Sequence, residues 1–156
     1  MATVRWRGNE WRRRTVQQAA SGLERGMALA TDAAVQRVSR GNPAPHTTPS
    51  LPGEPPRVRT GALRASLGHE VHVEGDVLIG RLGVREGPAS RYARALEFGF
   101  EGLVVVPGHT RRDAYGNEVL VRTHVRPMRL AARPYLRPTL GEQQATILRT
   151  TFEAIR

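Results

Sequence analysis

Residues Ala131–Leu140 read Ala-Ala-Arg-Pro-Tyr-Leu-Arg-Pro-Thr-Leu and contain two prolines, Pro134 and Pro138. Each proline fixes its own φ at about −65° and disfavours helix at the residue before it. Those preceding residues are Arg133 and Arg137, so both are expected to be extended. The sequence therefore predicts a stiff segment that presents an aromatic residue, a leucine and two guanidinium groups. Such a segment positions surfaces and has none of the features of a catalytic loop.

A C-terminal helix is predicted to follow this segment, over Leu140–Ile155. Thr139 and Glu142 have the spacing of a capping box, in which a threonine and a glutamate satisfy each other's backbone N–H groups. The helical period then places four apolar residues on one side, which are Ala145, Leu148, Phe152 and Ile155.

The length and composition predict one domain, residues 1–156, with a thin aliphatic core. The chain has 156 residues, of which 39% are hydrophobic and only 5% aromatic. It has no cysteine, which excludes disulfides, thiolate metal sites and a cysteine nucleophile. No apolar run approaches the roughly 20 residues needed to span a bilayer, and the N-terminus lacks the apolar core of a signal peptide. We expect a soluble protein made inside the cell, with no membrane partner.

The charge is strongly positive and consists entirely of arginine. The formal net charge is +10, all 24 basic residues are arginine, and lysine is absent. A nucleic-acid partner would explain this charge. A GC-rich genome would also favour arginine codons, and arginine suits fixed protein interfaces because its planar fork pairs with two acceptors. Composition alone leaves these explanations open.

A long N-terminal helix is predicted over Trp11–Val38. Its apolar residues recur every three or four positions, in one stripe made of Val16, Ala20, Leu23, Met27, Ala30, Ala34 and Val38. At 1.5 Å per residue this helix is about 42 Å long, so it either overhangs the domain or is covered by a neighbouring subunit. Gly22 and Gly26 permit another backbone to approach closely, or they are glycines tolerated in an ordinary core helix.

Aromatic and basic residues gather where this helix begins. Trp6, Trp11 and the Arg12-Arg13-Arg14 run are a candidate for stacking on bases and binding phosphates. The alternative is a solvated helix start with one tryptophan packed against the domain.

The middle of the chain predicts an extended segment and a first hairpin. Residues 41–59 contain six prolines and no apolar period, so they form either a loop that reaches a neighbour or a spacer. Thr60 is placed to cap a short helix over Gly61–Leu67. Two strands, His69–Glu74 and Val77–Val84, flank a tight turn at Gly75-Asp76.

A short helix and a second hairpin complete the expected fold. Ser90–Phe98 reads as helix, with Ser90 as its N-cap and Gly99 as its C-cap. Glu97 either pairs with an arginine or is an exposed helical glutamate. Leu103–Val106 and Glu118–Val125 predict two strands of a protruding hairpin, residues 101–126, whose tip carries Arg111 and Arg112. The predicted class is α+β, with a long N-terminal helix, a small and mostly antiparallel sheet with two hairpins, short helices and a C-terminal helix.

No catalytic constellation is found in the sequence. There is no GxSxG, Walker loop, HExxH or GxGxxG following a strand. The five histidines are scattered and lie at no metal-ligand spacing from a carboxylate. His69 and His72 would face opposite sides of a strand. We therefore expect no enzyme activity, no metal and no cofactor.

Three separated blocks of sequence have a family resemblance when they are taken in order. The first runs from Ser50-Leu-Pro-Gly-Glu-Pro-Pro to Thr60-Gly-Ala-Leu-Arg-Ala-Ser66. The second is Tyr92-Ala-Arg-Ala-Leu-Glu97-Phe-Gly99, and the third is Ala132-Arg-Pro-Tyr-Leu-Arg-Pro138. Together they resemble the neck, tail-completion or head–tail joining proteins of long-tailed phages, which also occur in prophages and gene transfer agents. Tyr135 stands where that family usually has phenylalanine, Thr139 where it has alanine, and Phe100 where it often has threonine.

The resemblance implies a structural virion protein that forms a ring, a hexamer or dodecamer, in the neck. Its implied partners are further copies of itself, a head-side connector or adaptor, a tail terminator or tail tube protein, and DNA in transit. Assembly would take place in the bacterial cytoplasm. Rings use heterologous contacts, in which different faces of neighbouring subunits meet. The candidate contact residues are Pro52, Gly53, Pro55, Pro56, Tyr92, Glu97, Arg133, Pro134, Tyr135, Arg137 and Pro138.

The competing interpretation is a basic nucleic-acid-binding protein. The residues that would face DNA are Arg12, Arg13, Arg14, Arg111 and Arg112. Such binding weakens steeply with salt because counterions are released when phosphates are neutralised.

Overall fold

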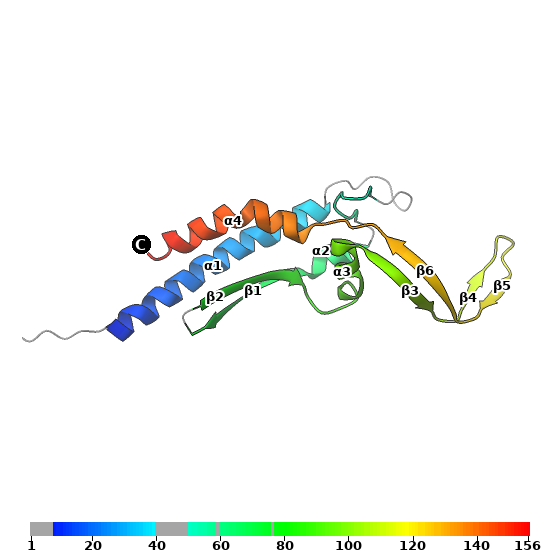
Figure 1. The fold of residues 1–156 in the computed structure, drawn as a ribbon, viewed down its shortest axis with the longest axis horizontal. Coiled ribbons are helices and arrows are strands. Elements are labelled where there is room, and N and C mark those ends of the chain that lie inside the picture. The colour runs from blue at the N-terminus through cyan, green and yellow to red at the C-terminus, as the bar shows by residue number, and fades with distance from the viewer. Residues whose placement is uncertain (1–7, 40–49, 59, 76) are drawn as a thin grey trace, which may run out of the picture.

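The computed structural model describes residues 8–39, 50–58, 60–75 and 77–156, and shows an elongated α+β chain organised around one helix (Figure 1). That helix, α1 (Gly8–Ser39), has 32 residues and is about 48 Å long at 1.5 Å per residue. Its buried residues are Ala19, Gly22, Leu23, Gly26, Met27, Ala30, Ala34 and Val38. The long N-terminal helix is therefore confirmed, and its apolar stripe is buried from Leu23 to Val38, whereas Val16 and Ala20 are half-buried. The first turns of α1 carry exposed side chains from Asn9 to Arg14.

Helix α4 (Leu136–Glu153) lies antiparallel along one side of α1. Gly22 and Gly26 of α1 make this possible, because their positions have no room for a side chain. A Cβ at Gly22 would lie 2.8 Å from the Thr151 Cα, and one at Gly26 would lie 2.8 Å from the Ile147 Cα. Of the two alternatives for these glycines, the structure supports the close approach of another backbone, and that backbone belongs to the same chain.

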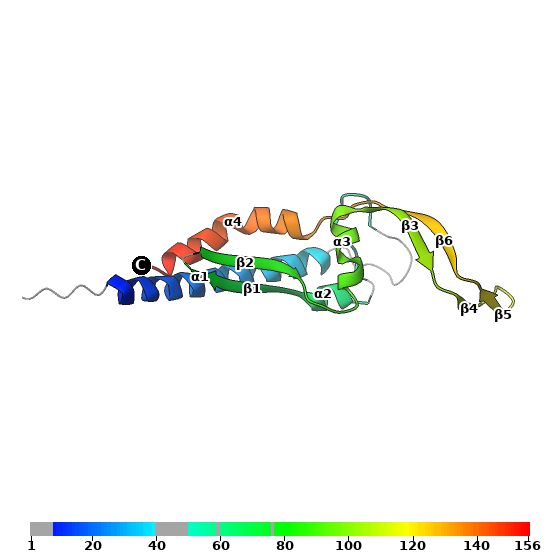
Figure 2. The same cartoon turned by 60° about the horizontal axis from the view of Figure 1, so that its bottom comes forward.

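A two-stranded hairpin covers another side of α1. Its strands are β1 (Leu67–Glu74), which begins two residues before the predicted His69, and β2 (Val77–Val84). They pair antiparallel with Glu74 opposite Val77 (Figure 2). Gly80 of β2 lies against Met27 and Leu23 of α1, where a Cβ would meet the Met27 Sδ at 2.9 Å. His69 of β1 also faces α1 and contacts Thr31 and Glu24 through its two ring nitrogens, at 2.8 and 3.1 Å. Gly75 has the expected positive φ of the turn, and Asp76 lies outside the described residues.

Two short helices stand at the end of this body from which the second hairpin extends. Helix α2 (Ala62–Ser66) follows Thr60, whose Oγ1 accepts a hydrogen bond from the Ala62 N–H at 3.3 Å. Helix α3 (Ser90–Phe98) has the predicted bounds and ends at Gly99, at φ +80°. Its N-cap is Ala89 and not Ser90, whose hydroxyl donates to the Gly87 carbonyl instead.

The second hairpin protrudes as an arm of four strands, residues 100–130. Strand β3 (Phe100–Val106) pairs with β6 (His124–Leu130), and β4 (His109–Arg112) pairs with β5 (Glu118–Val121) near the tip. The protruding hairpin of residues 101–126 is thus present with a different pairing. The predicted strand Glu118–Val125 is wrong as one element, because it is split between β5 and β6. Pro127 and two arginines, Arg126 and Arg129, conceal β6 in the sequence.

The start of α4 also differs from the prediction. The helix begins at Leu136, so Arg137 and Pro138 are helical and only the residues before Tyr135 are extended. Proline is tolerated in the first helical turn, where the backbone N–H has no partner within the helix. The capping box is wrong as well. The Thr139 hydroxyl donates to the Tyr135 carbonyl at 2.6 Å, and Glu142 forms an ion pair with Arg37 of α1.

The side of α4 that faces α1 is not its most apolar side. Ile147, Thr150, Thr151 and Ala154 lie against the two glycines of α1. The predicted apolar stripe instead faces outward, and its exposed members are Ala145, Leu148, Phe152 and Ile155. Helix α4 therefore leaves an apolar stripe without a partner among the described residues of this chain.

The best-packed part of the core lies where α1, β1 and the start of α4 meet. Ala34, Val38, Leu67 and Tyr135 form this cluster, and Leu63, Leu96 and Leu136 pack around it. Tyr135 has no exposed surface. The core is small and aliphatic apart from this ring, as the composition indicated.

Candidate assembly interface

The carboxylate of Glu97 is the centre of the most highly connected polar site in the described chain. Glu97 lies in the last turn of α3 and is only 3% exposed. Its Oε2 accepts hydrogen bonds from the backbone N–H groups of Tyr135 at 2.8 Å and Leu136 at 3.0 Å. Its Oε1 accepts from the Arg137 backbone N–H at 3.0 Å and from the Arg137 Nε at 3.3 Å. Glu97 is therefore paired, and the alternative of an exposed helical glutamate is wrong.

Glu97 acts as a cap for the N-terminus of α4. The N-cap residue, Tyr135, makes no capping hydrogen bond with its own side chain, so the first N–H groups of α4 need an acceptor from elsewhere. A carboxylate also complements the positive end of the helix dipole. Burial by itself would raise the pKa of Glu97, but the three backbone N–H donors and the Arg137 guanidinium outweigh it and hold that pKa below its ordinary value of 4.5. The site therefore stabilises the ionised form of Glu97.

Arg133 joins the same site to the described end of the proline-rich segment. Its Nε donates to the Ser50 Oγ at 2.9 Å and to the Ser50 carbonyl at 3.1 Å, and its Nη2 donates to that carbonyl at 3.0 Å. The Arg133 backbone N–H donates to the Leu96 carbonyl of α3, and the Gly53 N–H donates to the Ala132 carbonyl at 2.9 Å. Three stretches of sequence are thus held to one another, namely 50–56, 92–99 and 132–138.

The outer surface of this site is formed by Phe98 and Arg137. The guanidinium carbon of Arg137 lies 4.7 Å from the centre of the Phe98 ring, which is a cation–π geometry. Both side chains are largely exposed, and Tyr92 of α3 is exposed as well. An aromatic and an arginine presented together in this way are typical of the residues that dominate protein interfaces.

The candidate contact residues divide into three groups by exposure. Glu97, Tyr135 and Pro56 are buried, and Arg133, Pro134, Pro55 and Pro138 are half-buried. Pro52, Gly53, Tyr92 and Arg137 are exposed. The buried group cannot meet a neighbour directly, so its part in a subunit contact is to hold the exposed group in place. The remainder of residues 41–59, apart from 50–58, lies outside the described residues.

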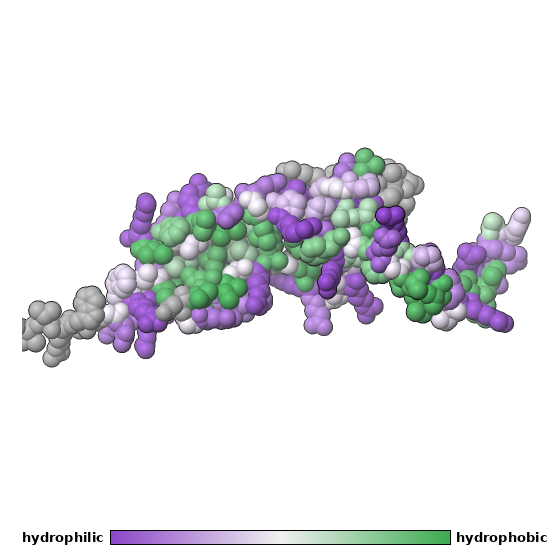
Figure 3. Space-filling model, in the orientation of Figure 1, coloured by the Kyte–Doolittle hydropathy of each residue, from purple (hydrophilic) through white to green (hydrophobic). Residues whose placement is uncertain are grey.

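Two exposed apolar surfaces were not recognised in the sequence as possible contacts (Figure 3). One is the outward stripe of α4, where Phe152 is 62% exposed. The other is one face of the arm, where Leu103 and Val105 of β3 are 73% and 63% exposed and Val125 of β6 is 58% exposed. The apolar period of α4 was visible in the sequence. Which side of a helix is buried depends on its partner, and the sequence pattern of α4 alone does not contain that information.

The five arginines predicted to face DNA do not form one patch. Arg12, Arg13 and Arg14 are exposed in the first turns of α1, whereas Arg111 and Arg112 are exposed on β4 near the tip of the arm. These places lie at opposite ends of the long axis of the molecule (Figure 1). Trp11 is 70% exposed beside the first group, and Trp6 lies outside the described residues.

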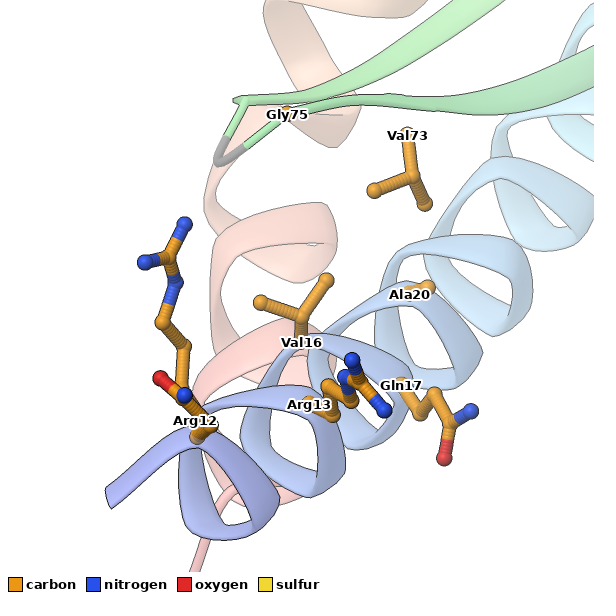
Figure 4. Close-up of a pocket in the computed structure, with 8 residues that line it drawn as sticks. Arg12, Arg13, Val16, Gln17, Ala20, Val73 and Gly75 are labelled. Carbon is orange, nitrogen blue, oxygen red and sulfur yellow. The ribbon is translucent and has the colours of Figure 1, made fainter.

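An open hollow of about 590 Å³ lies between the first half of α1 and the tip of the β1–β2 hairpin (Figure 4). Val16 and Ala20 of α1 face Val73 of the hairpin across it, and Arg12 and Arg13 are at its margin. The hollow has apolar walls and no carboxylate among its lining residues. Its lining contains no pair of groups suited to acid–base or nucleophilic chemistry.

Over the described ranges, no three His, Asp or Glu side chains lie close enough together to hold a metal ion. None of the described helices combines the length and apolarity needed to cross a bilayer. No family model, curated protein or solved structure gave a significant match to the chain.

Proposed function

We propose that this chain is a structural subunit of the head–tail connection of a tailed phage or phage-like particle. It forms a homo-oligomeric ring between the capsid connector and the tail, and DNA passes through the ring. The observation that carries the proposal is the convergence at Glu97. The blocks behind the family resemblance are distant in sequence, yet Ser50 binds Arg133, Glu97 binds the start of α4, and Leu63 packs in the cluster that contains Tyr135.

This convergence suits a subunit whose task is to hold surfaces at fixed angles. The Glu97 site fixes the position of α4 relative to α3, and α3 leads directly into β3 of the arm. A carboxylate that accepts from four donors in two directions is a rigid connection, because hydrogen bonds to an ionised group are stronger than those between neutral groups. The angle between body and arm is thus set by residues of the resemblance blocks.

The exposed apolar surfaces also support assembly. Burying a fully exposed Val or Leu side chain contributes about 1.5–3 kcal/mol, so the arm face and the α4 stripe represent a substantial unused driving force. The arm leads away from the body, and its strands contact mainly one another. Two different apolar surfaces, one on the body and one on the arm, are what a heterologous ring contact requires.

A second candidate function is nucleic-acid binding through the start of α1. The exposed Trp11 beside Arg12, Arg13 and Arg14 favours it, since aromatic stacking and phosphate contacts combine in non-specific binding to single strands. Tight binding that weakens about a thousandfold or more between about 50 and 200 mM salt would favour this function. A channel subunit should not hold DNA that tightly.

The proposed function is tested by deleting the gene in cells that produce the particles. We expect full heads and complete tails that remain unjoined, and joined particles when the wild-type gene is restored. The Glu86→Ala variant, which removes an exposed carboxylate from the loop between β2 and α3, should restore joining, whereas Glu97→Ala should restore it poorly. Normal joined particles in the deletion strain would refute the proposal.

A further inference from the structure

The two outer edges of the arm differ in their capacity to pair with another strand. Pro127 of β6 lies opposite Leu103 of β3. In an antiparallel pair, residues alternate between those that hydrogen-bond to the partner and those whose N–H and C=O point to the outer edge. Proline has no N–H, so a continuous ladder requires position 127 to be of the second kind. The same holds for the pairs Val105–Val125 and Glu101–Arg129, which are two residues away on either side.

This assignment leaves β6 with a blocked edge and β3 with an open one. On β6 the central outward position is Pro127, which offers no donor. On β3 the outward positions are Glu101, Leu103 and Val105, each with a donor and an acceptor. No backbone hydrogen bond joins these three residues to any other described part of the chain. Proteins usually protect an exposed apolar edge with proline, charge or a cover. Each edge here has one charged outward residue, Glu101 or Arg129, but only the β6 edge has a proline.

The body carries a second open edge. The β1–β2 hairpin has only two strands, and neither contains proline. Strand β2 is the one that contacts α4, so the outer edge of the sheet away from α4 is that of β1 (Figure 2). Two-stranded sheets are marginal on their own, and each of these would gain from a further strand.

These observations identify a second copy of this chain as the partner. The arm leads away from its own body, so β3 cannot reach β1 of the same copy. Pro127 removes the central donor from the outer edge of β6 and so disfavours pairing of one arm with β6 of the next. Each copy therefore has one open edge on the arm and one on the body, which is the arrangement that head-to-tail association needs.

We propose that β3 of one copy pairs, as an added strand, with the outer edge of β1 in the next copy. This inference rests on the proposed homo-oligomeric assembly and assigns its contact. Main-chain hydrogen bonds would supply affinity, and the outward side chains of Leu103 and Val105 would be covered by the neighbour.

Proline substitutions test the outer edge of β3 directly. Val105 and Val125 are partners across the β3–β6 pair, so they give matched variants. Val105→Pro removes an outward N–H from β3, and Val125→Pro removes one from β6. Both variants lose the same side chain from the same face and keep the ladder between β3 and β6. By sedimentation velocity over a concentration series, we expect Val105→Pro to weaken self-association about tenfold or more, the scale of one lost net hydrogen bond. Val125→Pro should match Val125→Ala.

Cysteine cross-linking then identifies the partner strand, which is simple because the chain has no native cysteine. Leu103→Cys protein is mixed with Val71→Cys protein, or with His69→Cys or Val73→Cys protein to sample the register, and oxidised. We expect disulfides between the two kinds of copy. Equal or faster cross-linking of Leu103→Cys with itself would overturn the assignment to β1. Equal effects of the two proline variants, or a monomer at every concentration, would overturn strand addition.

These outcomes are separable from those of the gene deletion. A chain that associates through β3 but is not needed for joined particles would refute the proposed function and leave the strand contact intact. If the chain is needed for joining but its Val105→Pro variant associates normally, the strand contact is refuted and the proposed function stands.

Discussion

Replacing Glu97 with alanine should destabilise the protein more than any other single removal of a carboxylate. The change leaves three backbone N–H groups at the start of α4 without their acceptor. The Tyr135 N–H is fully buried, whereas those of Leu136 and Arg137 lie closer to solvent and can bind water. A buried unsatisfied polar group costs about 1–3 kcal/mol, and breaking a buried charged pair costs about 3–5 kcal/mol. We therefore expect a loss of about 3–4 kcal/mol in the free energy of unfolding.

Thermal unfolding followed by circular dichroism measures this loss. For a chain of this size, 1 kcal/mol corresponds to about 2–4 °C, so the midpoint should fall by roughly 6–16 °C. The matched control is Glu101→Ala, where the ion pair with Arg129 is 3.4 Å long and both side chains are largely exposed, so the change should be below about 1 kcal/mol. If the two variants unfolded at the same temperature, Glu97 would not be the cap of α4, and our explanation of how the three segments are joined would fail.

Three further predictions concern the same elements. The pKa of Glu97 is held below 4.5, so its contribution to stability is present above that pH and is lost as the pH falls through the folded-state pKa. The difference in thermal midpoint between wild type and Glu97→Gln should therefore be constant above about pH 5 and shrink below it. Tyr135→Phe should raise the thermal midpoint by a few degrees, because the buried hydroxyl has no hydrogen-bond partner among the described residues and its desolvation costs about 1–3 kcal/mol. A lower midpoint would contradict this and indicate that the hydroxyl has a hydrogen-bond partner. Gly26→Ala should lower the thermal midpoint because the new Cβ would lie 2.8 Å from the Ile147 Cα. Gly141→Ala places its Cβ in open space and should raise the midpoint, because alanine has a higher helix propensity than glycine by about 1 kcal/mol. Similar shifts in the two variants would contradict the α1–α4 packing.

The elements with a strong local pattern could be predicted from the sequence. The stripe from Leu23 to Val38 repeats with the helical period, so α1 and its buried face follow from it. The predicted bounds of β2 and α3 were also correct. Gly75 lies in the turn before β2 and Gly99 directly follows α3, and both positions need a positive φ. These features depend on a few neighbouring residues and on no partner.

The predictions that were wrong concern features that depend on residues distant in sequence. Arg137 was expected to be extended because the proline that follows it disfavours helix at this position. It lies in the first turn of α4, where Glu97 from another helix satisfies the N–H groups and makes an early helix start favourable. The buried side of α4 was likewise set by Gly22 and Gly26, whose lack of side chains admits Thr150 and Thr151 ahead of the more apolar stripe.

The candidate site was predicted in part. An arginine partner for Glu97 was one of two alternatives left by the sequence, and the structure pairs Glu97 with Arg137 of the same chain. It did not indicate that Arg133 binds Ser50 and not a carboxylate, because a backbone carbonyl and a hydroxyl leave no distinctive pattern. The asymmetry of the arm edges required the strand register, which places Pro127 opposite Leu103.

The central claim, that this chain is a ring subunit at the head–tail junction, is tested most directly in the particles themselves. Purified particles would be analysed by quantitative mass spectrometry for the copy number of this chain, and cryo-electron microscopy would locate it by difference from particles that lack it. We predict a small, fixed copy number that corresponds to one ring, with density between the connector and the tail. Absence from the particles, or a copy number as high as that of a capsid or tail-tube protein, would contradict the claim.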